Sequence, residues 1–111
     1  MDIDGYQRKA HTFREADPAV TSSPLLYPVL GLMEEAGEVA GKFAKAVREE
    51  GGVITLERFQ AVCNELGDVV WFVAEICTCL GISFSSILEK NLEKLEDRKS
   101  RGVINGNGDT R

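Results

Sequence analysis

The sequence predicts an all-α fold, a four-helix bundle with one short helix followed by three longer ones, which we expect to oligomerise through its helices. Apolar residues recur with the three- and four-residue spacing of a helix face. Proline occurs only at positions 18, 24 and 28, and no segment alternates apolar and polar residues as a half-buried strand does. With 111 residues, the chain suits a single domain over residues 1–111, which we expect to end in an irregular tail at about 102–111.

The first two helices are separated by a loop of turn and capping residues. A weak helical pattern covers residues 6–15, and the loop follows at residues 17–24, DPAVTSSP. The second helix is predicted from Leu25 to about Glu50, with Pro28 near its start, where a helix tolerates proline. Its inward face is formed by Leu25, Val29, Leu32, Ala36, Val39 and Phe43.

The third helix is predicted to be the most buried element. It follows Gly51-Gly52, which end the second helix, and it runs from a Thr55 cap to Gly81. Apolar residues lie on several of its faces in addition to the main stripe. The main stripe comprises Phe59, Val62, Leu66, Val69, Val73, Ile76 and Leu80.

The fourth helix is predicted to begin at a serine cap and to end in positive charge. Either Ser83 or Ser86 is the cap, and Ser86 with Glu89 fits a capping box. The basic residues from Arg98 to Arg101 lie at its end, where they suit the helix dipole. Its inward face comprises Phe84, Ile87, Leu88, Leu92 and Leu95.

The composition excludes several classes of protein. A net charge of −5 disfavours broad binding of nucleic-acid polymers, because phosphates would be repelled. The longest apolar run, residues 69–74, is far shorter than the roughly 20 residues of a membrane span. No signal peptide opens the chain, and the odd number of cysteines (Cys63, Cys77 and Cys79) indicates buried, reduced thiols. We therefore expect a cytoplasmic protein with no membrane partner.

Two segments 30 residues apart share a pattern of acids around a glycine. They are EAGEV at residues 35–39 and ELGDV at residues 65–69. At about 100° per residue, the two acids of each segment lie on one side of its apolar stripe. If the two helices pack antiparallel, the acidic pairs converge in one cleft. Gly37 and Gly67 would let a helix or a ligand approach closely.

Four carboxylates in one cleft require a cation. Two like charges about 4 Å apart repel by about 4 kcal/mol at an effective dielectric constant of about 20. All-oxygen ligands favour Mg²⁺, with Mn²⁺ as a substitute, whereas zinc favours Cys or His. The sequence has no Glu-x-x-His pair, which disfavours a di-iron bundle. The alternative is a solvated acidic helix face that binds no metal.

The fourth helix carries polar residues that complement this cluster. Asn91 lies on or beside its inward stripe, and Lys94 and Arg98 follow at i+3 and i+7. Such a strip of amide, ammonium and guanidinium groups suits phosphate oxygens. For residues 98–101, a basic helix end that only satisfies the dipole is an equal alternative. The acidic cluster and the strip together indicate metal-assisted phosphoryl chemistry.

With these motifs, the sequence resembles the MazG-like nucleoside triphosphate pyrophosphohydrolases of the wider all-α NTP pyrophosphatase group. The family hallmark is Glu-Glu-x-x-Glu followed by Glu-x-x-Asp, which stands here at residues 34–38 and 65–68. The tail resembles one bacterial and phage branch, and the resemblance covers nearly the whole chain. Further similar segments are residues 6–7, 31–33, 69–72, 91–98 and 101–111.

The resemblance implies Mg²⁺-dependent hydrolysis of a nucleoside triphosphate to the monophosphate and pyrophosphate by a homodimer or homotetramer. The implied metal ligands are Glu35, Glu38, Glu65 and Asp68. The implied catalytic residues are Glu34, Glu35 and Glu38, with Glu34 orienting or deprotonating the attacking water. The implied phosphate ligands are Asn91, Lys94 and Arg98.

The residues that would contact base and sugar are less sharply defined. Trp71 and Phe72 follow Asp68 by three and four residues, so they lie near the cleft and are candidates for stacking on a base. Core or interface packing is an equal alternative for both rings. The weaker candidates are His11, Phe13 and Tyr27.

Two other functions remain open from the sequence. The same fold would also suit another nucleotide, such as phosphoribosyl-ATP or one deoxynucleotide such as dUTP or dCTP. In the other alternative, a non-catalytic helical dimer binds a nucleotide or a protein. A dimer is favoured independently, because the third helix is apolar around most of its circumference.

Overall fold

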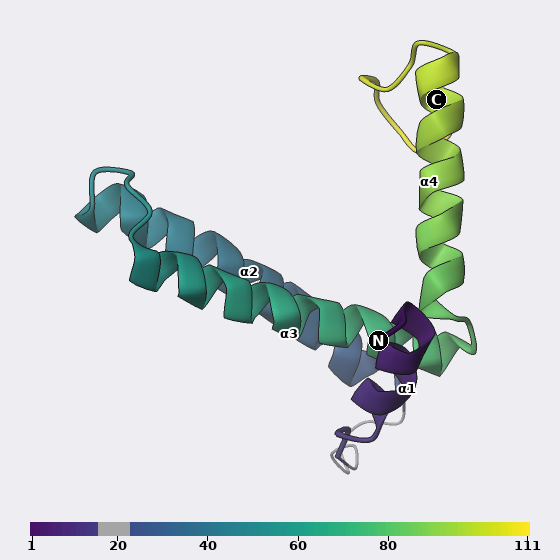
Figure 1. The fold of residues 1–111 in the computed structure, drawn as a ribbon, viewed down its shortest axis with the longest axis horizontal. Helices are drawn as coiled ribbons and strands as arrows, with labels where there is room; N and C mark the ends of the chain where they lie inside the picture. The colour runs from purple at the N-terminus through teal and green to yellow at the C-terminus, as the bar shows by residue number, and fades with distance from the viewer. Residues whose placement is uncertain (16–22) are drawn as a thin grey trace.

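The computed structural model describes residues 1–15 and 23–111, and every regular element in these ranges is a helix (Figure 1). The helices are α1 (Ile3–His11), α2 (Leu26–Glu49), α3 (Leu56–Leu80) and α4 (Phe84–Ser100). The prediction of an all-α fold with one short and three longer helices is confirmed. Most of the predicted loop at residues 17–24 lies outside the described residues.

The first helix begins and ends earlier than its sequence pattern predicts. The side chain of Asp2 accepts a hydrogen bond from the backbone N–H of Gly5, so the helix is capped before Ile3. It ends at His11, because residues 12 and 13 form a turn instead of a further helical turn. The predicted range of residues 6–15 is therefore wrong at both ends.

Side-chain caps also fix the starts of α3 and α4. Thr55 Oγ1 accepts from the N–H of Arg58 at 3.1 Å, as the sequence predicts. Ser83 Oγ accepts from the N–H of Ser86 at 3.3 Å, so Ser83 is the cap of α4. Ser86 lies inside the first turn and donates its hydroxyl to the Ser83 carbonyl oxygen. The predicted capping box at Ser86 is therefore wrong.

Glycines end the two long helices, as the sequence predicts. Gly51 and Gly52 have φ values of 62° and 81° after α2, and Gly81 has a φ of 70° at the end of α3. These left-handed conformations are open to glycine and costly for other residues. The first turn returns α3 antiparallel to α2, and the second redirects the chain into α4.

The four helices form an L-shaped chain (Figure 1). α2 and α3 pack side by side as one arm, α1 packs at the corner, and α4 leaves α3 after a bend of 104°. Among the described elements, α4 packs against α1 and α3 but not against α2. The radius of gyration is 17.2 Å, compared with about 13 Å for a compact domain of this length. Much apolar surface is therefore left uncovered within one chain.

The core lies where the arms meet and along the inner face of α3. Ala74, Cys77 and Phe84 form its buried cluster, against which Tyr6 and Val73 pack. Further along the arm, the Phe72 ring lies so close to α2 at Gly31 that a Cβ atom there would overlap it. As predicted, α3 is the most buried element. Its buried residues are Val62, Phe72, Ala74, Glu75 and Cys77.

Three expectations about packing do not hold in the single chain. Many residues of the predicted inward faces are uncovered, among them Phe43, Phe59 and Leu92, which are 46%, 57% and 59% exposed. Cys63 is exposed, so only Cys77 is a fully buried thiol, and Cys79 is partly exposed. The expected burial of Cys63 is wrong, because no described element covers its side of α3. No described atom lies within 4 Å of a Cβ placed on Gly37 or Gly67. Neither glycine is therefore the site of a close helix approach.

The helices give one further finding about membranes. Within residues 1–15 and 23–111, no single helix is long and apolar enough to cross a bilayer. Only the bent pair formed by α3 and α4 reaches the required length and composition when both helices are counted together.

Candidate metal site and its surroundings

Three carboxylates from the two long helices converge on one point. Glu35 on α2 and Glu65 and Asp68 on α3 each offer an oxygen atom, and these three oxygens lie within 4.8 Å of one another. Antiparallel packing brings Glu35 opposite the acidic pair of α3, and Glu65 and Asp68 are neighbours because they are three residues apart. We refer to these three residues as the carboxylate triad.

Negative charge is crowded within the triad. Partial burial raises the pKa of Glu35 above its ordinary value, and hydrogen bonding with Glu65 and the charges of Asp68, Glu65 and Glu34 raise this pKa further. A carboxyl that is hard to ionise beside other carboxylates gains from a cation at the same point. Three hard oxygen donors without Cys or His fit Mg²⁺ or Mn²⁺.

Glu38, the fourth predicted ligand, lies outside the triad and contacts a lysine. The Nζ of Lys42 lies 3.8 Å from Glu38 Oε2 and 3.5 Å from Glu65 Oε1. A Glu-to-Lys spacing of four residues is a common helical ion pair. Lys42 was not among the residues singled out from the sequence, although its i+4 position after Glu38 was a readable signal. Glu34 is exposed beside the triad.

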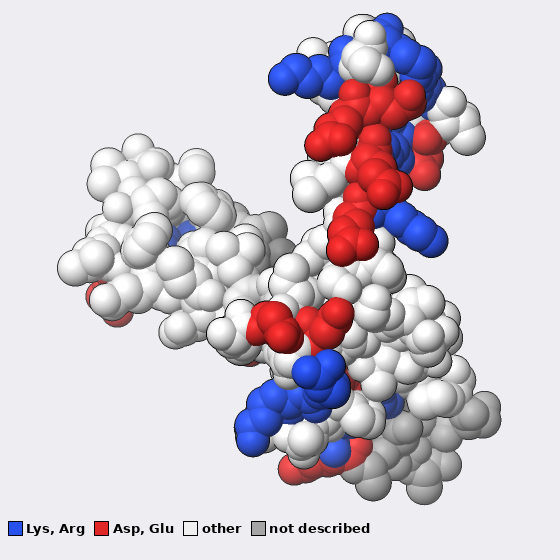
Figure 2. Space-filling model, turned by 45° about the vertical axis from the view of Figure 1, so that its right-hand side comes forward, with Lys and Arg blue, Asp and Glu red and all other residues white. Residues whose placement is uncertain are grey.

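The predicted phosphate ligands on α4 lie on the other arm of the chain. Lys94 Nζ is 2.7 Å from Asp109 Oδ1, and Arg98 Nη2 is 2.6 Å from the Asp109 carbonyl oxygen. Arg98 is buried by this contact, whereas Asn91 is exposed. The tail thus folds back on α4, where basic side chains gather at the far end beyond a line of acidic ones (Figure 2). Within one chain these cations face the tail and not the triad.

The two predicted base-stacking residues lie near the triad but are packed within the protein. Phe72 is buried and contacts Trp71 edge-on, with ring centroids 5.0 Å apart. Trp71 donates its indole N–H to the carbonyl oxygen of Ala10 at 3.1 Å. Tyr27 packs edge-on against Phe72 as well. A role of these rings in binding a base stays a prediction.

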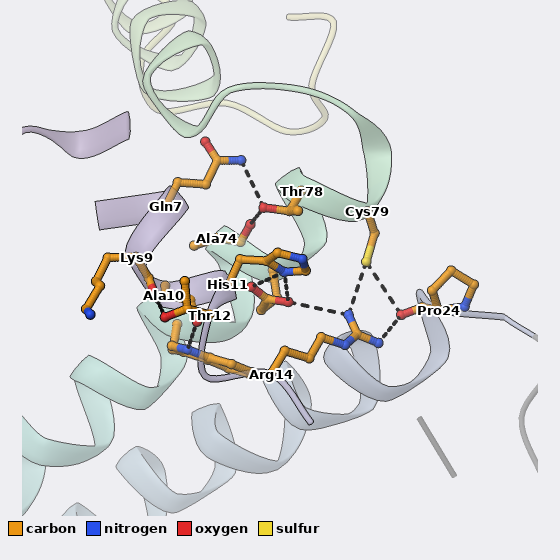
Figure 3. A network of polar contacts seen from close by, with 12 residues as sticks. Gln7, Lys9, Ala10, His11, Thr12, Arg14, Pro24, Ala74, Thr78 and Cys79 are labelled. Atoms are coloured by element: carbon orange, nitrogen blue, oxygen red, sulfur yellow. Dashed lines mark hydrogen bonds and ion pairs between the residues drawn. The ribbon is translucent and has the colours of Figure 1, made fainter. Parts of the chain in front are cut away.

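A buried carboxylate that the sequence analysis missed lies on the same face of α3 as Glu65 and Asp68. Glu75 is completely buried, and its Oε2 lies 3.2 Å from His11 Nδ1 and 3.5 Å from Arg14 Nη1. Figure 3 shows His11 and Arg14 reaching this carboxylate from the N-terminal segment. Arg14 also donates to the Pro24 carbonyl oxygen at 2.7 Å. This network joins α1 and the residues after it to α3 and to Pro24, which lies just before α2.

Two comparisons with known proteins found similar sequences. The model of the MazG nucleotide pyrophosphohydrolase domain matches residues 26–103, which include both acidic motifs and α4. The Gene 37 protein of Mycobacterium phage L5 is 47% identical over 114 aligned residues, and the alignment covers the whole of both chains. No solved structure matches the chain significantly.

The match over residues 26–103 covers most of the chain and defines its class. The protein belongs to the MazG nucleotide pyrophosphohydrolase family, as its acidic motifs predict.

Proposed function

We propose that this protein is a Mg²⁺-dependent pyrophosphohydrolase that cleaves a nucleoside or deoxynucleoside triphosphate to the monophosphate and pyrophosphate. The observation that carries the proposal is the carboxylate triad, whose three oxygens lie within 4.8 Å of one another in a member of this family. The cytoplasm, which holds both nucleotides and Mg²⁺, is the compartment in which we expect the activity.

The residues around the triad suit this reaction. Glu35, Glu65 and Asp68 would hold the cation, and Glu38, which contacts Lys42, would join them once Lys42 releases it. The bound cation would polarise phosphoryl oxygens and offset the negative charge that develops during transfer. Glu34, exposed beside the triad, would orient or deprotonate the attacking water. Asn91, Lys94 and Arg98 remain the proposed phosphate ligands on α4.

We further propose that the protein acts as a homodimer or homotetramer. Its L shape and its radius of gyration of 17.2 Å leave apolar side chains uncovered on every long helix. The α2–α3 arm also presents a face with few charged side chains (Figure 2). A second copy would bury such surface. The large exposed residues on this arm include Met33, Phe43, Val47, Phe59 and Leu66.

An assay of reaction products tests the proposed function. The purified protein is incubated with Mg²⁺ and each common ribo- and deoxyribonucleoside triphosphate, and with phosphoribosyl-ATP, and both products are quantified. We expect pyrophosphate and monophosphate. Asp68→Asn should lower the rate about 100-fold or more, because losing a ligand removes several kcal/mol of transition-state stabilisation.

Other outcomes would point to other functions. Cleavage of phosphoribosyl-ATP alone would change the substrate but keep the reaction. Orthophosphate with a nucleoside diphosphate would mean attack at the terminal phosphate and a different mechanism. If no nucleotide is cleaved and Asp68→Asn leaves Mg²⁺ affinity unchanged, the enzyme proposal fails in favour of a non-catalytic binding dimer.

A further inference from the structure

A polar cavity lies between the second half of α2 and the start of α3, and one residue of its lining, Lys42, contacts Glu65 of the carboxylate triad. Its volume is about 290 Å³, and its lining is mainly polar. This is at the small end of ligand pockets, which range from about 300 to 1,000 Å³. The cavity therefore suits the phosphate part of a nucleotide better than a whole nucleotide. Its lining contains three cations, Lys42, Lys45 and Arg58, and two carboxylates, Glu50 and Glu57.

Lys42 lies at the boundary between this cavity and the triad. It lines the cavity, and its Nζ is 3.5 Å from Glu65 Oε1 and 3.8 Å from Glu38 Oε2. Its side chain is 22% exposed, so the ammonium group is partly shielded from solvent. A ligand bound to a cation at the triad would lie close to this ammonium group. When a divalent cation takes the charge of Glu65, the ammonium group loses much of its attraction to that carboxylate and can bind another anion.

The other two cations of the cavity differ in their availability. Arg58 is held by Glu50, with its Nε 3.1 Å from Oε1, and lies 3.8 Å from Glu49 Oε2. Lys45 forms no ion pair with any residue that the structure describes and is exposed. It follows Lys42 by three residues, so both ammonium groups project from one side of α2.

We propose that Lys42 and Lys45 form a phosphate-binding subsite in this cavity, which takes a phosphate group of the metal-bound polyphosphate. The inference rests on the proposed function, because the polyphosphate is that of the proposed substrate or its pyrophosphate product. Lys42, which contacts Glu65, and Lys45, one helical turn further along α2, supply positive charge in a protein with a net charge of −5. An ammonium group recognises phosphate oxygens through charge-assisted hydrogen bonds.

Calorimetric titration of inorganic pyrophosphate at saturating Mg²⁺ tests the subsite without catalysis. Lys42→Met keeps the length of the side chain and its helix propensity but removes the charge. We expect about a tenfold loss of pyrophosphate affinity, because the variant removes a charge-assisted hydrogen bond to the phosphate oxygens. Lys42→Arg should retain most of the affinity, and Lys45→Met should lose a smaller, several-fold amount. Lys90→Met on the exposed face of α4 is the matched control and should change nothing.

A titration with Mg²⁺ alone separates this role from a structural one. Lys42→Met should bind Mg²⁺ as tightly as the unmodified protein or more tightly, because a competing cation has left Glu65. The proposal is overturned if Lys42→Met keeps full pyrophosphate affinity, if it weakens Mg²⁺ binding, or if the unmodified protein binds no pyrophosphate. A loss of pyrophosphate affinity in Lys94→Met but not in Lys42→Met would place the phosphates on α4 instead.

The proposed function and the subsite can fail separately. If pyrophosphate binding depends on the lysines but no nucleotide is cleaved, the subsite is supported and the proposed enzymatic function is contradicted. Cleavage of a nucleotide by a protein whose pyrophosphate affinity does not depend on Lys42 would do the reverse.

Discussion

Two sets of carboxylates lie on one face of α3, about two helical turns apart, and they are balanced in opposite ways. Glu75 is fully buried, and His11 and Arg14 both contact its carboxylate. Glu65 and Asp68 instead face a third acid, Glu35, and the one ion pair of the triad with a described cation is with Lys42. A carboxylate on α3 is thus structural where neighbouring cations balance its charge. It is available to bind a cation where its neighbours are other carboxylates.

Removing Glu75 should have the largest effect on stability. Glu75→Ala removes a fully buried carboxylate that contacts both Arg14 and His11, and it opens a space in the core. Breaking a buried pair of this kind costs about 3–5 kcal/mol, and we expect about 3 kcal/mol because His11 is half exposed. Urea unfolding measures the change. A loss below about 1 kcal/mol would show that Glu75 is no more structural than the triad.

Gly31 tests whether the close contact of α2 with the Phe72 ring sets the distance between α2 and α3 in the stretch between Glu75 and the triad. A methyl group at Gly31 would overlap the Phe72 ring, which lies between Glu75 and the triad along α3. Overpacking of this kind costs about 1–3 kcal/mol, offset by about 1 kcal/mol of helix propensity. We expect Gly31→Ala to lower the unfolding free energy by about 1 kcal/mol.

A second glycine on α2 supplies the control for Gly31. No described atom lies within 4 Å of a Cβ at Gly41, so Gly41→Ala should stabilise the protein by up to about 1 kcal/mol. If both variants change stability in the same direction, the close contact at Phe72 does not set the helix spacing.

The smallest expected effect concerns the tail on α4. Hydrogen bonds from Lys94 and Arg98 hold the pKa of Asp109 below its ordinary value of 3.8. The stabilising contact is therefore complete above pH 3.8 and is lost as the pH falls through the lower value in the folded protein. NMR of the Gly106 and Gly108 amides should report release of the tail in that range. Asp109→Asn should loosen the tail at every pH, because it removes the charge that Lys94 and Arg98 contact but keeps the hydrogen bond to the backbone carbonyl oxygen. An unchanged amide spectrum would contradict the role of the side-chain contact.

The sequence predicted the helices and the convergence of acids because both depend on local periodicity. The wheel positions of Glu35, Glu65 and Asp68 follow from their spacing, and antiparallel packing of α2 and α3 follows from the short glycine turn between them. Glu38, predicted as a fourth ligand, stands one turn along α2 and contacts Lys42. Glu38 is outside the triad because its side chain does not reach the point where the other three carboxylates converge. Helical spacing alone does not specify which side chains reach that point.

The features that the sequence did not predict depend on contacts between distant segments. The burial of Glu75 requires His11 and Arg14, which are more than 60 residues away in the chain. The direction of α4 is set by the turn at Gly81, and the contact of Arg98 with Asp109 depends on how the tail returns. Periodicity marked Arg98 as a polar residue on a helix, but it did not indicate what this residue would bind.

Direct titration with Mn²⁺, followed by electron paramagnetic resonance, tests the central claim that the triad is a divalent cation site. Glu65→Gln is compared with the unmodified protein and with Glu89→Gln on α4 as a control of equal charge change. We expect saturable binding in the unmodified protein and in Glu89→Gln, and about 10- to 100-fold weaker binding in Glu65→Gln, with no loss of melting temperature in the absence of metal. Equal Mn²⁺ affinity in all three proteins would contradict the account.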